Sequence, residues 1–556
     1  SAMKNKISPQ RSCLWALLTG LALLAVRILS VHDVHGPVVY GDEFIYWKNM
    51  MALFVSPGSV NSGYPPLYSS WMAIGMFWPD TYRGVLLLNV LAGAVLPFAA
   101  WRISAHLSGP SRIMSVVLLS VMPVLWVYPR MMMSENLFLP LLVLIFLAIH
   151  AQFRSKTIWP ALLAGIFLWL ASMTRYQGII FIIAAVLSMA VTLLWWYRDA
   201  GNPRPEKDRG RHRIAGLFLV AGIPAAGILL WKWFGVPGSW EFGQTTAYIY
   251  RHGIQLTPGL LLMWVTFYLS YLVLCILPVL PALLHGGWRV LTAKKKDPSS
   301  MAVMLFLVFS TGASLLAAAR HSALVEYNHP DPSHIMGRYL IFVPALSVLC
   351  LLVFPYLRET LNCQSRRVYL GIWSGCAVLG ILAYGVVVGG WFYTIPSWFL
   401  MTHTGLGAFF YKSHIVVAVT AILIGLLVFL PNRVFYLTAL AVFLSAASFT
   451  GRSDHFNNAD GPEAFTAILE DTLQEHENAL VGTSSRGWFK DLHAGYYLKF
   501  KGMDMQRVRI GEGFENPDVA AVVRIEPAAG SGERPLFVAD DGMAVYVDTR
   551  EDELPD

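Results

Sequence analysis

Long apolar runs recur along the chain between residues 12 and 450. We count about thirteen runs of roughly 18 residues or more, each long enough for an α-helix to cross a hydrocarbon core of about 30 Å. The sequence therefore predicts a polytopic α-helical membrane protein. The expected spans lie at 12–31, 84–101, 112–128, 135–153, 158–173, 178–197, 214–234, 259–284, 301–319, 338–356, 369–390, 413–430 and 433–450.

The composition excludes an ordinary soluble protein. Hydrophobic residues make up 56% of the 556 residues and charged residues 13%, about half of the charged share that globular domains have. Of the 41 Lys and Arg residues, 31 precede residue 451, whereas 21 of the 34 Asp and Glu residues follow residue 450. The basic charge thus lies in loops between apolar runs, which argues against nucleic-acid binding. The five cysteines lack C-x-x-C spacing, so we expect neither a disulfide framework nor a structural zinc site.

The loop charges also predict an orientation. With a cytoplasmic N-terminus, 21 of those 31 basic residues fall in cytoplasmic segments, as the positive-inside rule requires. An odd number of spans then places the acidic tail outside the cytoplasm. We expect a transmembrane domain over 1–450 and a small extracytoplasmic α/β domain over 451–556. In that tail we expect strands near 479–482, 519–525, 536–538 and 543–547 and a helix over 488–500.

Candidate functional residues gather on the side opposite the basic loops. Asp42 and Glu43 follow the first expected span in GDEFIYWK; one can act as a base while the other orients a ligand or a metal, and the alternative is two solvated loop acids. Glu135 follows Ser134 at the start of the fourth span, where the alternative is a helix-capping pair. Arg175 lies in MTRYQG, and its alternative is a snorkelling arginine.

The later outer loops add further polar residues. Arg338 and Tyr339 begin the tenth expected span, and an arginine there can bind a phosphate through two parallel hydrogen bonds. Three side chains in one loop are of the types that ligate a divalent metal, but their spacing is not diagnostic and ordinary polar loop residues remain the alternative: His329, Asp331 and His334. Four other residues are candidates for substrate contacts: Tyr64, Arg251, His252 and Glu326.

Five short segments carry a specific resemblance. They are the acid pair after the first span, YPPLY, R-x-x-x-S-E-N-L, T-R-x-x-G and G-R-Y-L. Together they resemble the GT-C superfamily of integral-membrane glycosyltransferases. They are most similar to the branch that uses polyprenyl-phosphate sugars, which includes bacterial protein-mannosyl, lipid A aminoarabinosyl, galacturonosyl and arabinofuranosyl transferases. The resemblance covers residues 12–345, and the tail is not diagnostic.

The resemblance implies a role for each matching residue. Asp42 would be the catalytic base, with Glu43 beside it and Glu135 as a further active-site acid. Arg175 and Arg338 would bind the donor phosphate, with Tyr339 next to Arg338. The expected enzyme transfers a sugar, with inversion, from a polyprenyl-phosphate donor to a hydroxyl of an extracytoplasmic glycan, lipid or protein. Its expected place is the bacterial inner membrane, with the active site on the extracytoplasmic side.

Two other classes of protein stay open at the level of sequence. A transporter or flippase of lipid-linked sugars would also have many spans, but it should carry ionisable residues or broken helices near mid-membrane. Here the polar residues lie at one end of the expected bundle. A non-catalytic carbohydrate-binding or assembly protein would have less reason for the acid pair and the arginines. A D-x-D sequence in a nucleotide-sugar-binding context is absent, which favours a lipid-linked donor.

Overall fold

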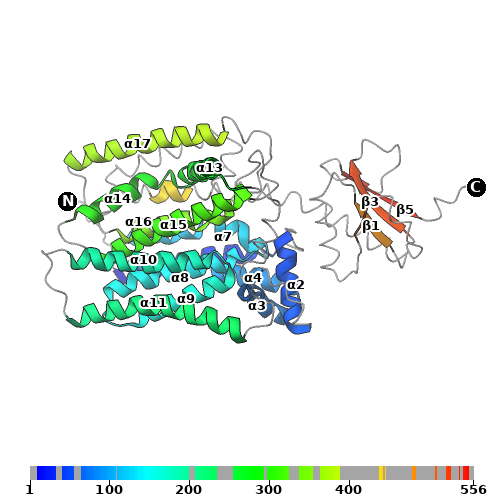
Figure 1. The fold of residues 1–556 in the computed structure, drawn as a ribbon, viewed down its shortest axis with the longest axis horizontal. Helices are drawn as coiled ribbons and strands as arrows, with labels where there is room; N and C mark the ends of the chain where they lie inside the picture. Colours follow the sequence, from blue (N-terminus) through cyan, green and yellow to red (C-terminus); the bar gives the residue numbers. More distant parts are fainter. Residues whose placement is uncertain are drawn as a thin grey trace, which may run out of the picture.

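A computed structural model describes most of the helical part of the chain and the strands of the tail (Figure 1). The described residues are 9–32, 41–55, 64–107, 109–198, 207–234, 255–293, 297–324, 337–354, 363–388, 437–442 and 445, together with five strands after residue 478.

Helices make up nearly all of the structure before residue 389. The α-helices and the 3-10 helices, labelled η, are α1 (Pro9–Ser30), α2 (Gly41–Val55), α3 (Pro66–Met72), η2 (Ala73–Phe77), α4 (Thr81–Gly93), α5 (Val95–Ile103), η3 (Ser104–His106), α6 (Gly109–Ser120), α7 (Val124–Val127), η4 (Tyr128–Arg130), α8 (Glu135–Arg154), α9 (Trp159–Thr174), α10 (Gly178–Tyr197), α11 (Lys207–Phe234), α13 (Pro258–Ile276), α14 (Leu280–Thr292), α15 (Pro298–Leu324), η6 (Gly337–Leu340), α16 (Phe342–Val353) and α17 (Cys363–Val388).

The described helices fit a multi-pass membrane protein. Among the described residues there are seven stretches of helix long and apolar enough to cross a membrane, one of which, Thr81–His106, consists of α4, α5 and η3 together. There are eight if α6 and the pair of α7 and η4, which are bent by 56°, form one span. Shorter apolar helices occupy three more of the expected positions, at Trp159–Thr174, Arg338–Val353 and Leu370–Ala383. Apart from 437–442 and 445, the spans expected at 413–430 and 433–450 lie outside the described residues. The total of thirteen therefore stays a prediction.

One expected span is divided in the structure. We expected a single helix over 259–284, but α13 ends at Ile276 and α14 begins at Leu280. The prediction was wrong because Pro278 and Pro281 stand at the junction, and a proline removes a backbone donor and clashes with the preceding turn of a helix. An apolar run by itself does not reveal such a break.

The core of the bundle forms around α8. Phe138 of α8 and Phe342 of α16 each meet the ring of Phe181 edge-on, with centroids 5.5 Å and 4.8 Å apart. Because lipid is as apolar as these side chains, tight packing holds the helices together. A second, smaller cluster joins the end of α1 with α2, α3 and α4, and its buried members include Tyr46, Tyr68 and Met72.

The segment after α1 is more helical than we expected. No span was expected between residues 31 and 84, and the structure has the 15-residue α2 in this segment, followed by α3 and η2. Glu43, Tyr46 and Met50 are buried on α2 at the spacing of one helix face. Figure 1 shows α2 and α3 at one end of the bundle.

The tail contributes a mixed five-stranded sheet. Its order is β2-β1-β3-β5-β4, with β1 parallel to β2 and β3, and β5 antiparallel to β3 and β4. Four of the strands lie near the positions expected from the sequence, whereas the three-residue β2 was not expected. The helix expected over 488–500 lies outside the described residues, so the α/β domain stays a prediction. The strands are β1 (Ala479–Thr483), β2 (Arg507–Arg509), β3 (Ala521–Pro527), β4 (Phe537–Val538) and β5 (Met543–Thr549).

Candidate active site

The five segments that carry the resemblance meet at the end of the bundle where α2 and α3 lie. They are the first turns of α2, the residues around the start of α3, the segment that leads into α8, the turn between α9 and α10, and η6. Direct contacts between side chains or rings connect each of them to at least one other. Residues far apart in the sequence therefore form one polar cluster.

A buried ion pair lies at the centre of this cluster. Arg175 Nη1 pairs with Glu135 Oε1, and the side chains are 12% and 1% exposed. Arg175 also donates to Ser134 Oγ at 3.0 Å. Burial of Arg175 opposes its charge, but the adjacent Glu135 carboxylate outweighs that effect and raises the guanidinium pKa above its ordinary value. Arg175 is thus a fixed, permanently charged group, and the snorkelling interpretation is wrong.

The Ser134 side chain binds other members of the polar cluster and does not cap α8. It precedes Glu135 but makes no side-chain capping hydrogen bond, so the capping interpretation is wrong for this residue. Its hydroxyl accepts from Tyr46 Oη at 2.8 Å and from Arg175, and lies 3.4 Å from Glu135 Oε2. One hydroxyl therefore joins α2, α8 and the turn after α9.

Tyr46 connects α2 with the YPPLY segment. Its ring meets Tyr64 and Tyr68 edge-on, with centroid distances of 5.3 Å and 5.0 Å. Tyr68 Oη donates to Asn89 Oδ1 at 3.3 Å, and burial raises the pKa of Tyr68 well above its ordinary value. Tyr68 therefore stays protonated, and these aromatic side chains form a rigid wall beside the ion pair.

The structure describes the side chain of only one of the two adjacent acids of α2. Glu43 is fully buried and accepts a hydrogen bond from Met132 N–H at 2.6 Å, so it is not a solvated loop acid. Asp42 lies one residue earlier in the first turn of α2, and its side chain is outside the described part. Glu43 fastens α2 to the segment that leads into α8.

The two arginines meet at Tyr339 in η6. The Arg175 and Arg338 Cζ atoms lie 5.9 Å and 5.7 Å from the centroid of its ring, within the range of cation–π attraction. Gln177 Nε2 donates to Tyr339 O at 2.7 Å and to Ser314 Oγ at 3.1 Å. The cluster thus offers two guanidinium groups beside one aromatic ring.

Several expected site residues lie outside the described residues: Arg251, His252, Glu326, His329, Asp331 and His334. Among the residues that the structure does describe, no group of three His, Cys, Asp or Glu side chains could hold a metal ion. The metal ligands therefore stay a prediction.

The sequence analysis overlooked three members of the cluster, Tyr46, Ser134 and Gln177, as binding groups. All three lie inside the motif segments, so the motifs themselves were the available signal. Their partners come from distant parts of the chain, and no local pattern predicts such contacts.

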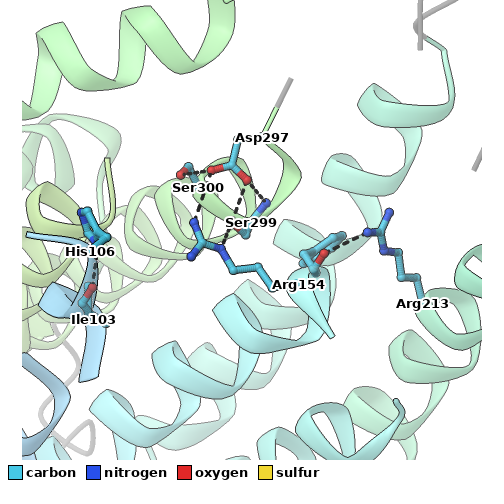
Figure 2. A network of polar contacts seen from close by, with 8 residues as sticks. Ile103, His106, Arg154, Arg213, Asp297, Ser299 and Ser300 are labelled. Carbon is cyan, nitrogen blue, oxygen red and sulfur yellow. Dashed lines mark hydrogen bonds and ion pairs between the residues drawn. The ribbon is translucent and has the colours of Figure 1, made fainter. Parts of the chain in front are cut away.

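A second polar network lies at the opposite end of the bundle (Figure 2). Asp297, just before α15, accepts from the Ser299 and Ser300 hydroxyls, each at 2.7 Å. Arg154 Nε at the end of α8 donates to Ser299 Oγ at 3.1 Å. Arg213 of α11 donates to Phe153 O at 2.8 Å. These contacts bind helix ends together and include no residue of the candidate site.

Comparisons with known proteins find similarity in the fold. No protein-family model matches the sequence, and no curated protein matches it. The solved structure of ArnT from Cupriavidus metallidurans bound to undecaprenyl phosphate matches with a TM-score of 0.53 and 14% identity over 98% of this chain and 99% of that one. ArnT in the apo state matches with the same TM-score and 16% identity over the same shares.

A weaker match is the oligosaccharyltransferase of Archaeoglobus fulgidus, tethered with an acceptor peptide. Its TM-score is 0.41 and its identity 12%, over 91% of this chain and 68% of that one. The chain thus shares the fold of the two ArnT structures, which agrees with the resemblance that its motifs carry.

Proposed function

We propose that the chain is a membrane glycosyltransferase that moves a sugar from a polyprenyl-phosphate donor to a hydroxyl of an extracytoplasmic glycan, lipid or protein. The observation that carries the proposal is the meeting of the five motif segments in one polar cluster, on a fold similar to that of ArnT, which has been solved with undecaprenyl phosphate bound. Arginines beside carboxylates at the end of a helical bundle suit a donor whose lipid tail remains in the bilayer while its phosphosugar reaches the interface.

The reaction is a single displacement at the anomeric carbon. Asp42 takes the proton of the acceptor hydroxyl, and the hydroxyl oxygen forms a bond to the anomeric carbon through an oxocarbenium-like transition state. The bond between that carbon and the phosphate oxygen breaks, and the polyprenyl phosphate leaves with the electron pair. Attack opposite the leaving group inverts the anomeric centre. Because phosphate is a good leaving group, no general acid is required.

The arginines stabilise the charge that gathers on the departing phosphate. Preorganised positive groups contribute most where charge develops in a site with little water. Arg175 is held in place by Glu135 and Ser134, so little reorganisation is needed when the phosphate develops charge. Arg338, whose guanidinium also lies near the Tyr339 ring, is the second phosphate ligand. No step of this scheme requires a metal ion.

The direct test is release of polyprenyl phosphate by the purified protein in lipid nanodiscs. Undecaprenyl phosphates that carry radiolabelled pentoses, hexoses or amino sugars serve as donors, with envelope extracts as the acceptor source. We expect the release of lipid phosphate and transfer of label to the acceptor, both lost in Asp42→Asn. In liposomes, movement of intact donor between leaflets without cleavage would identify a flippase and reject the proposal.

A further inference from the structure

Arg27 is a buried arginine that the proposed chemistry does not use. It lies in the last turn of α1 and its side chain is among the largest fully buried ones, with the residue 1% exposed. Its Nε donates to Leu125 O at 3.1 Å and its Nη2 to Val90 O at 3.2 Å. A charged side chain inside a membrane span is costly and usually marks a function or a specific partner.

The two carbonyl groups that Arg27 binds lack their regular helical partners. The helical partner of Leu125 O would be the N–H of residue 129, which is a proline and has none. The partner of Val90 O would be the N–H of Ala94, which donates to Leu91 O at 3.0 Å instead. Because an unpaired carbonyl is costly in lipid, one guanidinium stabilises the break between α4 and α5 and the break around α7.

The space for Arg27 is built into α4. A Cβ atom added to Gly93 would lie 2.5 Å from Arg27 Nη2, a distance at which something must shift. Gly93 stands at the end of α4, next to the break. The glycine thus lets the guanidinium approach the backbone, and the position of Arg27 depends on this local geometry.

Arg130 makes the reciprocal contact. From η4 it donates through Nε and Nη2 to Ser30 O, at 3.2 Å and 2.7 Å. Ser30 ends α1, where the last carbonyl groups lack helical partners and a cation is favoured. We call α7 and η4 together the bent segment. Arg27 therefore binds from α1 to the bent segment, and Arg130 binds from the bent segment to α1. We call this pair of contacts the arginine clamp.

The segment that the clamp holds leads directly into the candidate site. Met132 N–H binds Glu43, and Met131 O accepts from the Asn89 and Asn136 side-chain amides at 3.1 Å and 2.8 Å. Glu135, the partner of Arg175, begins α8 a few residues later. A shift of the bent segment would move all of these groups together.

We propose that Arg27 and Arg130 are positioning residues that fix the segment from Tyr128 to Glu135 against α1 and thereby hold the Glu135–Arg175 pair in place. The structural part of this proposal is independent of the reaction. Its consequence for catalysis rests on the proposed function.

Amide hydrogen exchange tests the structural part in nanodiscs, with no substrate needed. In Arg27→Met we expect the amides of residue 128 and residues 130–135 to exchange about tenfold faster or more, because the local opening free energy falls when buried contacts are removed. Gly93→Ala should give the same pattern, since it displaces the guanidinium without deleting it. It also keeps the test valid if Arg27→Met does not fold.

Arg213→Met is the matched control. Arg213 is also buried, at 6% exposed, and also donates to a backbone carbonyl group, but this group is Phe153 O near the end of α8, far from Glu135 at its start (Figure 2). We expect it to leave exchange at 128–135 unchanged. The proposal is overturned if Arg27→Met and Gly93→Ala both exchange like the wild type at 128–135, or if Arg213→Met speeds exchange there equally.

A double-mutant cycle tests the catalytic part. We expect Arg27→Met to lower kcat/KM for the donor about tenfold in the wild type and by less than about threefold in a Glu135→Gln background, because coupled positions are not additive. Equal losses in both backgrounds would contradict action through Glu135. A wild type that is inactive with every donor would count against the proposed function alone, since the exchange result would stand.

Discussion

Asp42 and Glu43 illustrate how neighbouring residues of one type can differ in role. Glu43 is buried and bonded to Met132 N–H, which ties it to the scaffold. We expect Asp42→Asn to lower transfer by about 10² or more while donor binding survives, because asparagine keeps the size but cannot take a proton. Glu43→Gln keeps an acceptor oxygen for Met132, so its loss should be smaller. Single-turnover transfer by each variant is the measurement.

The outcome of that comparison separates two assignments. If Glu43→Gln has no transfer activity while Asp42→Asn is nearly as active as the wild type, Glu43 is the base and Asp42 is not. Normal turnover by both variants would reject the mechanism.

The buried pair of Arg175 and Glu135 allows a prediction on stability. Arg175→Met leaves the Glu135 carboxylate buried without its partner, and breaking a buried pair in this way costs about 3–5 kcal/mol. Adding Glu135→Leu replaces the pair by apolar side chains, which is often neutral. We expect the melting temperature in detergent to fall in the single variant and recover in the double variant, with transfer absent from both. An active double variant would show that Arg175 is not a phosphate ligand.

Arg338 should be sensitive to a change that keeps its charge. A lysine cannot reproduce the two parallel hydrogen bonds of a guanidinium to a phosphate. We therefore expect Arg338→Lys to weaken binding of the polyprenyl-phosphate donor about tenfold or more while the melting temperature stays near that of the wild type. Equilibrium binding of labelled donor in nanodiscs is the measurement, and unchanged affinity would remove Arg338 from the site.

At the scale of helices, the length of an apolar run predicted well that a helix is present, but it did not predict where that helix is interrupted. A run of 18 apolar residues has few alternatives to a membrane helix, which is why α8, α10 and α15 lie where expected. The division of α13 from α14 and the bend between α6 and α7 depend on prolines inside apolar runs. Whether a proline kinks, breaks or merely begins a helix is decided by neighbouring helices, as the carbonyl groups held by Arg27 illustrate.

The start of α15 carries a pH-dependent contact. Asp297 accepts from Ser299 N–H and from the Ser299 and Ser300 hydroxyls, and lies 3.9 Å from Arg154. Burial raises the pKa of Asp297, but these donors and Arg154 outweigh it and the net shift is downward. A carboxyl with a lowered folded pKa adds stability above its unfolded pKa of about 3.9, and this is lost as the pH falls through the folded value.

We therefore expect Asp297→Ala to destabilise the protein at pH 7 by about 0.5–2 kcal/mol, the usual cost of losing a side chain that accepts hydrogen bonds from the first turn of a helix. The difference from the wild type should shrink as the pH falls below about 4. Melting temperatures in detergent across that range are the measurement. A difference that stayed constant down to pH 3 would show that the carboxylate charge is unimportant here.

At the scale of the whole molecule, the sequence indicated which segments carry the candidate site but not which residues of these segments contact one another. The motif segments with Asp42, Glu135, Arg175 and Arg338 were found from the resemblance, and the structure brings them to one end. The contacts among them could not be predicted, because pairs such as Glu43 with Met132 arise only when α2 packs on a bent segment far along the chain. The roles of these residues stay predictions until variants are measured.

The ends of the bundle also differ in how their arginines are used, and this bears on topology. At the end with the candidate site, Arg27, Arg130 and Arg175 are bound inside the protein. At the other end, Arg213 is buried as well, but Arg154 and Lys156 are exposed. Because exposed basic residues near helix ends favour the cytoplasmic side, we predict that the candidate site faces outward and, with an odd number of spans, that the sheet of the tail does too.

Two probes check this prediction separately. In a cysteine-free background, an impermeant maleimide should label Ser70→Cys, at the site end and exposed, in intact spheroplasts, and should label Lys156→Cys only after lysis. A protease added outside should cleave the tail. Reversed labelling would put the site in the cytoplasm and reject extracytoplasmic transfer. Correct labelling with a protected tail would mean an even number of spans, because the chain would then cross once more or once less after the described helices.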